Sequence, residues 1–143
     1  MIQNRKLKIY FASSSKFIDK VKELAVMIDV AIGPIEVTRA WWKYHHEDNE
    51  LFENYTDEHY YAHPQVQLIR HYDKIAIREA DIVIVYNEYR YKLTGATWEM
   101  GFAEGVGTPV IVLGDLKRST MYSGAIFARS LDELIEALKR WIN

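Results

Sequence analysis

The chain has 143 residues, the length of a single domain, and a formal net charge of −2 at pH 7. A balance so near neutrality gives no global attraction to nucleic acid, and the lack of cysteine excludes disulfides, thiolate nucleophiles and cysteine-bound metals. No apolar run approaches the roughly 18 residues of a membrane span, and residues 1–6 lack the apolar core of a signal peptide. We therefore expect one cytoplasmic domain, residues 1–143, with neither nucleic acid nor membrane as a partner.

The first third of the chain predicts a strand, a helix and a second strand. Residues 8–12 form a short apolar run, and the serines at 13–15 can cap the helix that follows. Within residues 17–28 the apolar side chains recur every three or four positions, as on one face of a helix, and the Gly-Pro pair at 33–34 ends it. In residues 35–41 apolar side chains alternate with polar ones and some are β-branched, a pattern that predicts the second strand.

Residues 43–63 show no periodicity and hold six acids, four of the five histidines and four tyrosines. A long irregular segment in a compact domain is usually a functional loop, and the many aromatic residues argue against disorder. The pair His45-His46 and the spacing of His59 and His63 suggest metal ligands, but the glutamate that accompanies such spacing in zinc enzymes is missing. We interpret the segment as a polar, acidic loop and expect no metal.

The remaining elements alternate between helix and strand. The pattern predicts helices over residues 64–79, 96–106 and 131–142 and strands over residues 81–86 and 110–114, with a capping box at Ser130 and Glu133. Strands that are apolar at consecutive positions are buried on both faces of a parallel sheet. The chain is thus predicted to be an α/β protein, an open parallel sheet of Rossmann-like type with helices on both faces. Ligands of such folds bind at the carboxyl ends of the strands, where the strand order reverses.

Three titratable side chains are expected near those strand ends. Tyr10 lies in the first strand, Asp73 on the helix before the central strand, and Glu99 near the start of the helix that includes Ala96. Each has a plain structural alternative: a core ring for Tyr10, a solvated position for Asp73 and, for Glu99, a first-turn carboxylate that complements the helix dipole. The functional alternative for Glu99 is a nucleophile or general base held beside the glycine turn at Gly95.

Three blocks of sequence together resemble the nucleoside 2-deoxyribosyltransferase family. They are KIYFA at 8–12, Asp73 followed by IREADIVIV at 77–85, and TGATWEMGFA at 94–103 with GTPVI at 107–111. Their order and spacing match over residues 7–114, and the block around Glu99 is the most specific. The resemblance implies a small flavodoxin-like domain that assembles into homo-oligomers (dimers, tetramers or hexamers), with the site near a subunit interface.

The resemblance also implies a role for each candidate. Glu99 is the nucleophile that attacks the anomeric carbon of a 2′-deoxyribonucleoside and forms a covalent deoxyribosyl ester, which the incoming base opens with net retention. Tyr10 hydrogen-bonds this glutamate, and Asp73 lies at the base end of the site and exchanges a proton with the base. These residue types suit the chemistry, because a carboxylate stabilises an oxocarbenium-like sugar and a departing base needs a proton.

Aromatic residues make up 13% of the chain, more than core packing requires, which indicates a lined pocket or a subunit interface. Trp41 and Trp42 end the second predicted strand, so that one is expected in the core and the other can stack a nucleobase. Ser13 and the two serines after it are either a helix cap or an anion site. No Gly-x-Gly-x-x-Gly follows the first strand, and we expect no dinucleotide or other cofactor.

The sequence departs from the family pattern at two places. Leu93 stands where some members carry a second aspartate, six residues before the nucleophile, and Glu88 is the candidate replacement. The family completes its pocket with a polar residue from a neighbouring subunit, for which Ser119 and Ser123 are the nearest candidates. The preference for purine or pyrimidine and the recognition of the 5′ group therefore stay open.

We interpret the chain as a nucleoside 2′-deoxyribosyltransferase of nucleotide salvage that acts on deoxynucleosides and free nucleobases through Glu99. One alternative is a hydrolase of deoxynucleoside 5′-monophosphates with the same nucleophile, although the loop after the first strand lacks the arginine that such hydrolases tend to carry. A second alternative is a non-catalytic module that senses a nucleotide.

Overall fold

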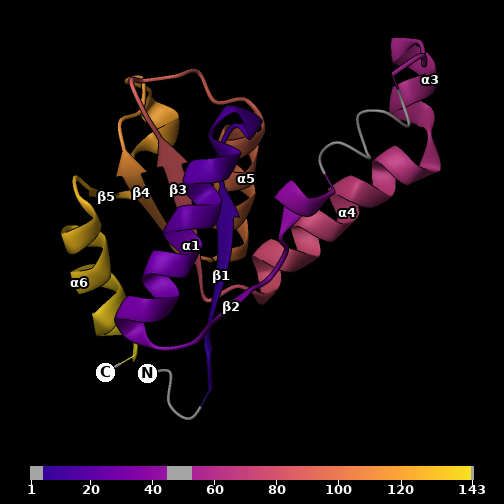
Figure 1. Ribbon diagram of the computed structural model, residues 1–143. Helices are drawn as coiled ribbons and strands as arrows, with labels where there is room; N and C mark the ends of the chain where they lie inside the picture. The colour runs from indigo at the N-terminus through magenta and orange to yellow at the C-terminus, as the bar shows by residue number, and fades with distance from the viewer. Residues whose placement is uncertain (1–4, 45–52, 143) are drawn as a thin grey trace.

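Five strands form one all-parallel sheet in the computed structural model, which describes residues 5–44 and 53–142 (Figure 1). The strands are β1 (Leu7–Ala12), β2 (Ile35–Val37), β3 (Ile82–Asn87), β4 (Val110–Gly114) and β5 (Ile126–Ala128). The α-helices are α1 (Ile18–Ile32), α3 (Asp57–Ala62), α4 (Pro64–Glu79), α5 (Gly95–Val106) and α6 (Leu131–Ile142), and short 3₁₀ helices are η1 (Ser15–Phe17), η2 (Trp41–Lys43) and η3 (Thr120–Tyr122). The strand order is β2-β1-β3-β4-β5, so the direction of winding reverses between β1 and β3.

Helices cover both faces of the sheet because the strand side chains alternate between the two faces. On β1, Ile9 and Phe11 belong to the core shared with α1 and α6, whereas Tyr10 and Ala12 belong to the core shared with α4 and α5. These four side chains are almost completely buried. Figure 1 shows α3 and the amino-terminal half of α4 projecting beyond the body that the sheet and the other helices form.

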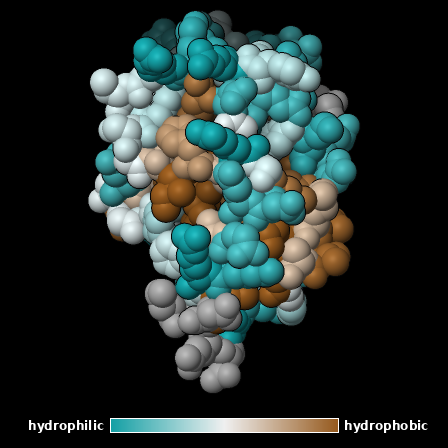
Figure 2. All heavy atoms as spheres, turned by 90° about the vertical axis from the view of Figure 1, so that its left-hand side faces the viewer, coloured by the Kyte–Doolittle hydropathy of each residue, from teal (hydrophilic) through white to brown (hydrophobic). Residues whose placement is uncertain are grey.

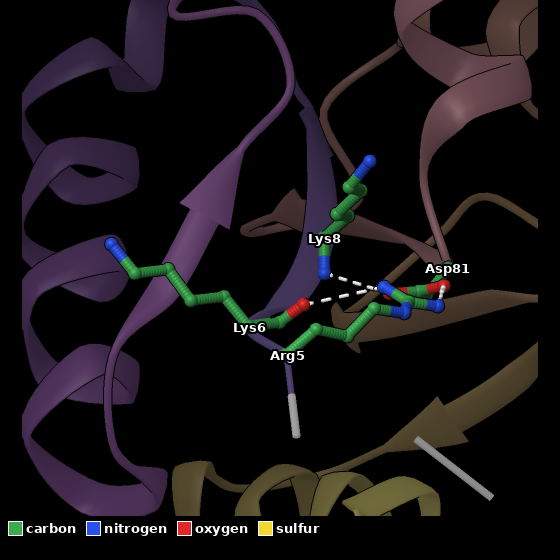
Figure 3. A network of polar contacts seen from close by, with 4 residues as sticks. All are labelled: Arg5, Lys6, Lys8 and Asp81. Atoms are coloured by element: carbon green, nitrogen blue, oxygen red, sulfur yellow. Dashed lines mark hydrogen bonds and ion pairs between the residues drawn. The ribbon is translucent and has the colours of Figure 1, made fainter. Parts of the chain in front are cut away.

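A clamp ties the amino ends of β1 and β3 together (Figure 3). The guanidinium of Arg5 donates two hydrogen bonds to the carboxylate of Asp81, at 2.7 and 2.9 Å, and the backbone N–H of Lys8 donates a third at 2.8 Å. Burial raises the pKa of Asp81, but the hydrogen bonds from Arg5 and Lys8 outweigh it and hold that pKa below its usual range. The clamp therefore stabilises the sheet at the end opposite the carboxyl ends of the strands.

At the carboxyl ends, β3 and β4 meet in close backbone contact. Gly114 adopts a φ of 111°, and a Cβ atom there would overlap the carbonyl oxygen of Asn87 on β3. The buried Asn87 side chain donates to the carbonyl oxygens of Tyr91, at 2.9 Å, and Asp115, at 2.7 Å. Asn87 thereby joins the two loops that leave β3 and β4.

The α/β class, the parallel sheet and the helices on both faces are confirmed, but two sequence predictions about local structure are wrong and one strand was missed. The second strand ends at Val37 instead of residue 41, because the chain turns there into η2. The segment 43–63 is not irregular throughout, since Thr56 caps α3 by accepting a hydrogen bond from the His59 N–H. The strand β5 was not predicted at all. His45 and His46 lie outside the described residues.

The face that carries α6 and β5 is mostly hydrophilic, with patches of apolar side chains between the polar ones (Figure 2). Ile126 and Phe127 on β5 are about half exposed, as befits a short strand at the edge of a sheet. In residues 5–44 and 53–142, no helix combines the length and the apolar character needed to span a membrane.

Candidate functional site

A cavity of about 390 Å³ opens at the carboxyl ends of β1, β2 and β3, beside the reversal of strand order. Its walls come from the serines after β1, the segment after β2, the loop before α5 and the facing sides of α4 and α5. This volume lies within the usual range of small-molecule sites. The cavity brings together six of the predicted site residues, namely Tyr10, Ser13, Trp41, Asp73, Gly95 and Glu99.

Glu99 and Tyr10 form a hydrogen-bonded pair at the floor of this cavity. The phenol O–H of Tyr10, which is 1% exposed on β1, donates to Oε2 of Glu99 on α5. Burial raises the pKa of Glu99 to about 8; the Tyr10 hydrogen bond opposes the rise, the charge of Asp73 adds to it, and Arg70 and Arg39 oppose it. Burial and the neighbouring carboxylates also raise the pKa of Tyr10 well above its ordinary value, so the phenol stays a proton donor.

Asp73 is held by an arginine that the sequence analysis does not single out. Nε of Arg39 donates to Oδ1 of Asp73 at 2.9 Å, and the two side chains are 17% and 22% exposed. Arg39 follows β2 and also lies against the rings of Tyr44 and Tyr72, with its Cζ 5.7 and 5.5 Å from their centroids. In the sequence, the position of Arg39 at the carboxyl end of a strand is the indication that it belongs to the site. This position alone does not distinguish Arg39 from a solvated arginine.

Backbone hydrogen bonds fix two further side chains of the cavity wall. The indole N–H of Trp41 donates to the carbonyl oxygen of Phe11 at 2.7 Å, which ties η2 to the end of β1. The hydroxyl of Ser13 donates to the carbonyl oxygen of Tyr86 at 2.8 Å. Ser14 caps the short helix η1, since its oxygen accepts from the N–H of Lys16, whereas α1, for which the serine cap was predicted, begins after Phe17 without a side-chain cap. The wall on this side is therefore set by main-chain contacts.

Trp42 is the tryptophan of the pair that belongs to the core. It packs against the core between the sheet, α1 and α6, with its ring edge-on to Phe11 at 6.4 Å between centroids. Trp41 faces the cavity instead, because successive residues of the turn η2 point in different directions. Of the two tryptophans that were candidates for binding the base, Trp42 is therefore the structural one and does not line the site.

Glu88 does not stand in for the missing second aspartate. Its carboxylate accepts a hydrogen bond from the phenol of Tyr86 and does not line the cavity. The chain turns directly after it, with φ of 52° at both Tyr89 and Arg90. Leu93 itself is 6% exposed and lines the cavity as an apolar wall.

One further expectation about position needs correction, and one about a neighbouring subunit stays a prediction. Glu99 is not in the first turn of its helix, because α5 begins at Gly95 and holds no acidic residue in its first turn. This weakens the interpretation of Glu99 as a dipole-complementing carboxylate. In this single chain neither Ser119 nor Ser123 lines the cavity, and the Ser119 hydroxyl accepts from the N–H of Met121 to cap η3.

His59 and His63 each occupy an ordinary structural position. His63 caps α4, with its Nδ1 accepting from the N–H of Gln65 at 3.1 Å, and its ring lies 5.4 Å from that of Tyr55. His59 lies on α3. Among the residues that the structure describes, no group of three or more histidines and acids is placed to hold a metal ion.

Comparison with known proteins identifies the fold. No protein-family model matches the chain, and no curated protein sequence matches it either. Among solved structures, a 2-deoxyribosyltransferase from the psychrotolerant bacterium Bacillus psychrosaccharolyticus superposes with a TM-score of 0.58 and 16% identity, over 90% of each chain. The chain shares the fold of this 2-deoxyribosyltransferase. This finding confirms the family resemblance at the level of the fold.

Two other solved structures share the fold of this chain. A conserved protein from Enterococcus faecalis matches with a TM-score of 0.65 and 17% identity, over 96% of this chain and 100% of that chain. A CMP N-glycosidase from Clostridium botulinum matches with a TM-score of 0.54 and 15% identity, over 93% of this chain and 98% of that chain. Identities this low establish a common fold and leave the reaction to be argued from the site.

Proposed function

We propose that the chain is a nucleoside 2′-deoxyribosyltransferase whose nucleophile is Glu99. The observation that carries the proposal is the placement of Glu99: a largely buried carboxylate that accepts a hydrogen bond from Tyr10 inside a cavity of nucleoside size, with Asp73 on the wall beside it. A 2-deoxyribosyltransferase is among the structures of the same fold, which supports this choice of chemistry.

In the proposed reaction an oxygen of Glu99 attacks the anomeric carbon as the bond between sugar and base breaks. The base leaves with a proton from the site, where Asp73 is the exchanging group, and a deoxyribosyl ester of Glu99 remains. A second base then attacks the same carbon from the opposite face, gives up its proton and releases the carboxylate. Two inversions give net retention, as in retaining glycosidases.

The remaining features of the proposal concern ligands and assembly. Trp41 presents a fixed indole as a stacking surface for the nucleobase, and Ser13 and Gly95 border the space for the sugar. The proposed substrates are deoxynucleosides and free bases, and the proposed enzyme is a homo-oligomer of single-domain subunits with its site near a subunit interface.

A base-exchange panel tests the proposal. Deoxyinosine and thymidine serve as donors, adenine and cytosine as acceptors, and chromatography detects the new deoxynucleosides. We expect exchange with wild-type protein and none with Glu99→Gln, and we expect a donor without acceptor to leave a deoxyribosyl group on the peptide that contains Glu99, detected by mass spectrometry. Exchange at an undiminished rate in Glu99→Gln would refute the assignment of the nucleophile.

The second candidate function is hydrolysis of a nucleotide, which a CMP N-glycosidase among the structures of the same fold favours. The same panel, extended to deoxynucleoside 5′-monophosphates, separates the two. Release of free sugar or sugar phosphate without exchange selects the hydrolase. Calorimetric binding without any product selects a non-catalytic nucleotide-sensing module.

A further inference from the structure

We propose that Arg39 is a positioning residue of this site: its guanidinium holds the carboxylate of Asp73 in place on the cavity wall and offsets the negative charge that Asp73 brings near Glu99. Its meaning for catalysis rests on the proposed function, whereas its effect on the two carboxylates can be tested without any turnover.

The geometry is that of a built contact between two distant segments. Arg39 and Asp73 are 34 positions apart, and the 2.9 Å bond from Nε to Oδ1 joins the end of β2 to α4. Both side chains are mostly buried, so solvent and salt screen the pair less than a surface pair. The rings of Tyr44 and Tyr72 flank the guanidinium and restrict its rotation. Arg39 is therefore a fixed cation in the wall of the cavity.

Four groups face Glu99 from the elements packed around it. Tyr10 on β1 donates a hydrogen bond, Asp73 on α4 adds a negative charge, and Arg70 on α4 and Arg39 after β2 add positive charges. Arg70 lies over the ring of Trp98, with its Cζ 3.6 Å from the centroid. Arg39 is a cation of this group that pairs directly with Asp73, whose negative charge raises the pKa of Glu99.

The chemistry gives this pairing a consequence. A nucleophilic carboxylate must be ionised, and the pKa of Glu99 already lies near 8 because the side chain is buried. Without Arg39, Asp73 would lose a direct cationic partner and Glu99 would lose a nearby positive charge, so ionising Glu99 would become harder still. With Arg39 present, the site can hold the carboxylate of Asp73 for the base while Glu99 can still ionise and attack the sugar.

The first test is a ¹³C-carboxylate NMR titration of Glu99 in the free protein. We expect Arg39→Gln to move the titration midpoint up by about one pH unit, whereas Arg39→Lys, which keeps the charge, stays close to wild type. Arg140→Gln is the matched control, since it removes an exposed arginine from α6 on the other face of the sheet and is expected to leave the midpoint unchanged. A midpoint in Arg39→Gln that is unchanged or lower overturns the proposal.

A double variant keeps the test decisive if Arg39→Gln folds poorly. Arg39→Gln combined with Asp73→Asn removes both charges, and its midpoint is expected to return to the wild-type value or below. Circular dichroism confirms that each variant is folded before it is titrated. A double variant whose midpoint stays well above the wild-type value would show that Asp73 is not the source of the effect and would also overturn the proposal.

The second test is the pH profile of kcat/KM for base exchange. Arg39→Gln is expected to lose about tenfold at pH 7 and much less above pH 9, because high pH ionises Glu99 in both proteins. An active wild type with an unshifted profile in Arg39→Gln refutes the role of Arg39 and leaves the proposed function standing. If wild-type protein neither exchanges nor hydrolyses, the proposed function fails, and the titration alone then decides the role of Arg39.

Discussion

Removing one hydroxyl, in Tyr10→Phe, tests the central pair of the site. With a pKa of about 8, Glu99 is ionised in about one tenth of the molecules at pH 7. The Tyr10 hydrogen bond favours the ionised form, and a hydrogen bond to a charged group is worth about 1.5–3 kcal/mol, or about one to two pH units. Its loss should therefore lower kcat/KM at pH 7 by about 10- to 100-fold and move the acid limb of the pH profile upward by the same interval.

Base exchange measured from pH 6 to pH 10 is the assay. The control is Tyr86→Phe, which removes the hydroxyl from another, partly buried tyrosine–glutamate pair outside the cavity and should leave the profile in place. An acid limb of Tyr10→Phe at the wild-type position, or below it, would refute the reasoning. A uniform loss at every pH would show that Tyr10 orients Glu99 without tuning its ionisation.

Three further variants test the energetics of the fold. Glu99→Gln should have a higher free energy of unfolding than wild type, and by calorimetry this difference should grow as pH rises from 4.5 to about 8, because the native state resists ionising the carboxyl of Glu99. A difference that shrinks over this range would contradict the burial cost. The free energy of unfolding of Asp81→Asn should be about 1–2 kcal/mol lower than that of wild type at pH 7, and this difference should fade as pH falls through the range in which the wild-type carboxyl protonates. A difference that does not depend on pH would show that the charge of Asp81 plays no part. In urea unfolding, Gly114→Ala should lower the free energy of unfolding by at least about 3 kcal/mol, because the added Cβ overlaps Asn87. Gly105→Ala, in open space on α5, is the control and should raise it by a few tenths to about 1 kcal/mol. Equal effects at both glycines would refute the steric argument.

The sequence predicted the sheet well where burial leaves an unmistakable pattern. β3 and β4 are apolar at consecutive positions, and the structure places both in the interior of a parallel sheet. β5 escaped prediction because it is three residues long and lies at an edge, where Ile126 and Phe127 remain half exposed. The helix α3 carries few apolar side chains with helical spacing, and Thr56 at its start was the signal that identifies it.

Part of the candidate site was also predictable from the sequence. Parallel strands end at one edge, so Tyr10 and Glu99 were expected together, and the structure joins them by a hydrogen bond. The choice between Trp41 and Trp42 depends on how a 3₁₀ turn is oriented, which no periodicity encodes. Arg39 was missed because an ion pair between residues 34 positions apart has no local pattern.

The order of the strands also determines when the site can come into existence during folding. Tyr10 and Glu99 are 89 positions apart, and their contact requires β1 to lie beside β3 and α5 to have packed onto the sheet. Closing so long a loop is a late event in a chain dominated by non-local parallel pairing. In a refolding experiment the hydrogen bond between Tyr10 and Glu99 should therefore form after the helices appear, as a marker that β1 and β3 have paired and α5 has docked.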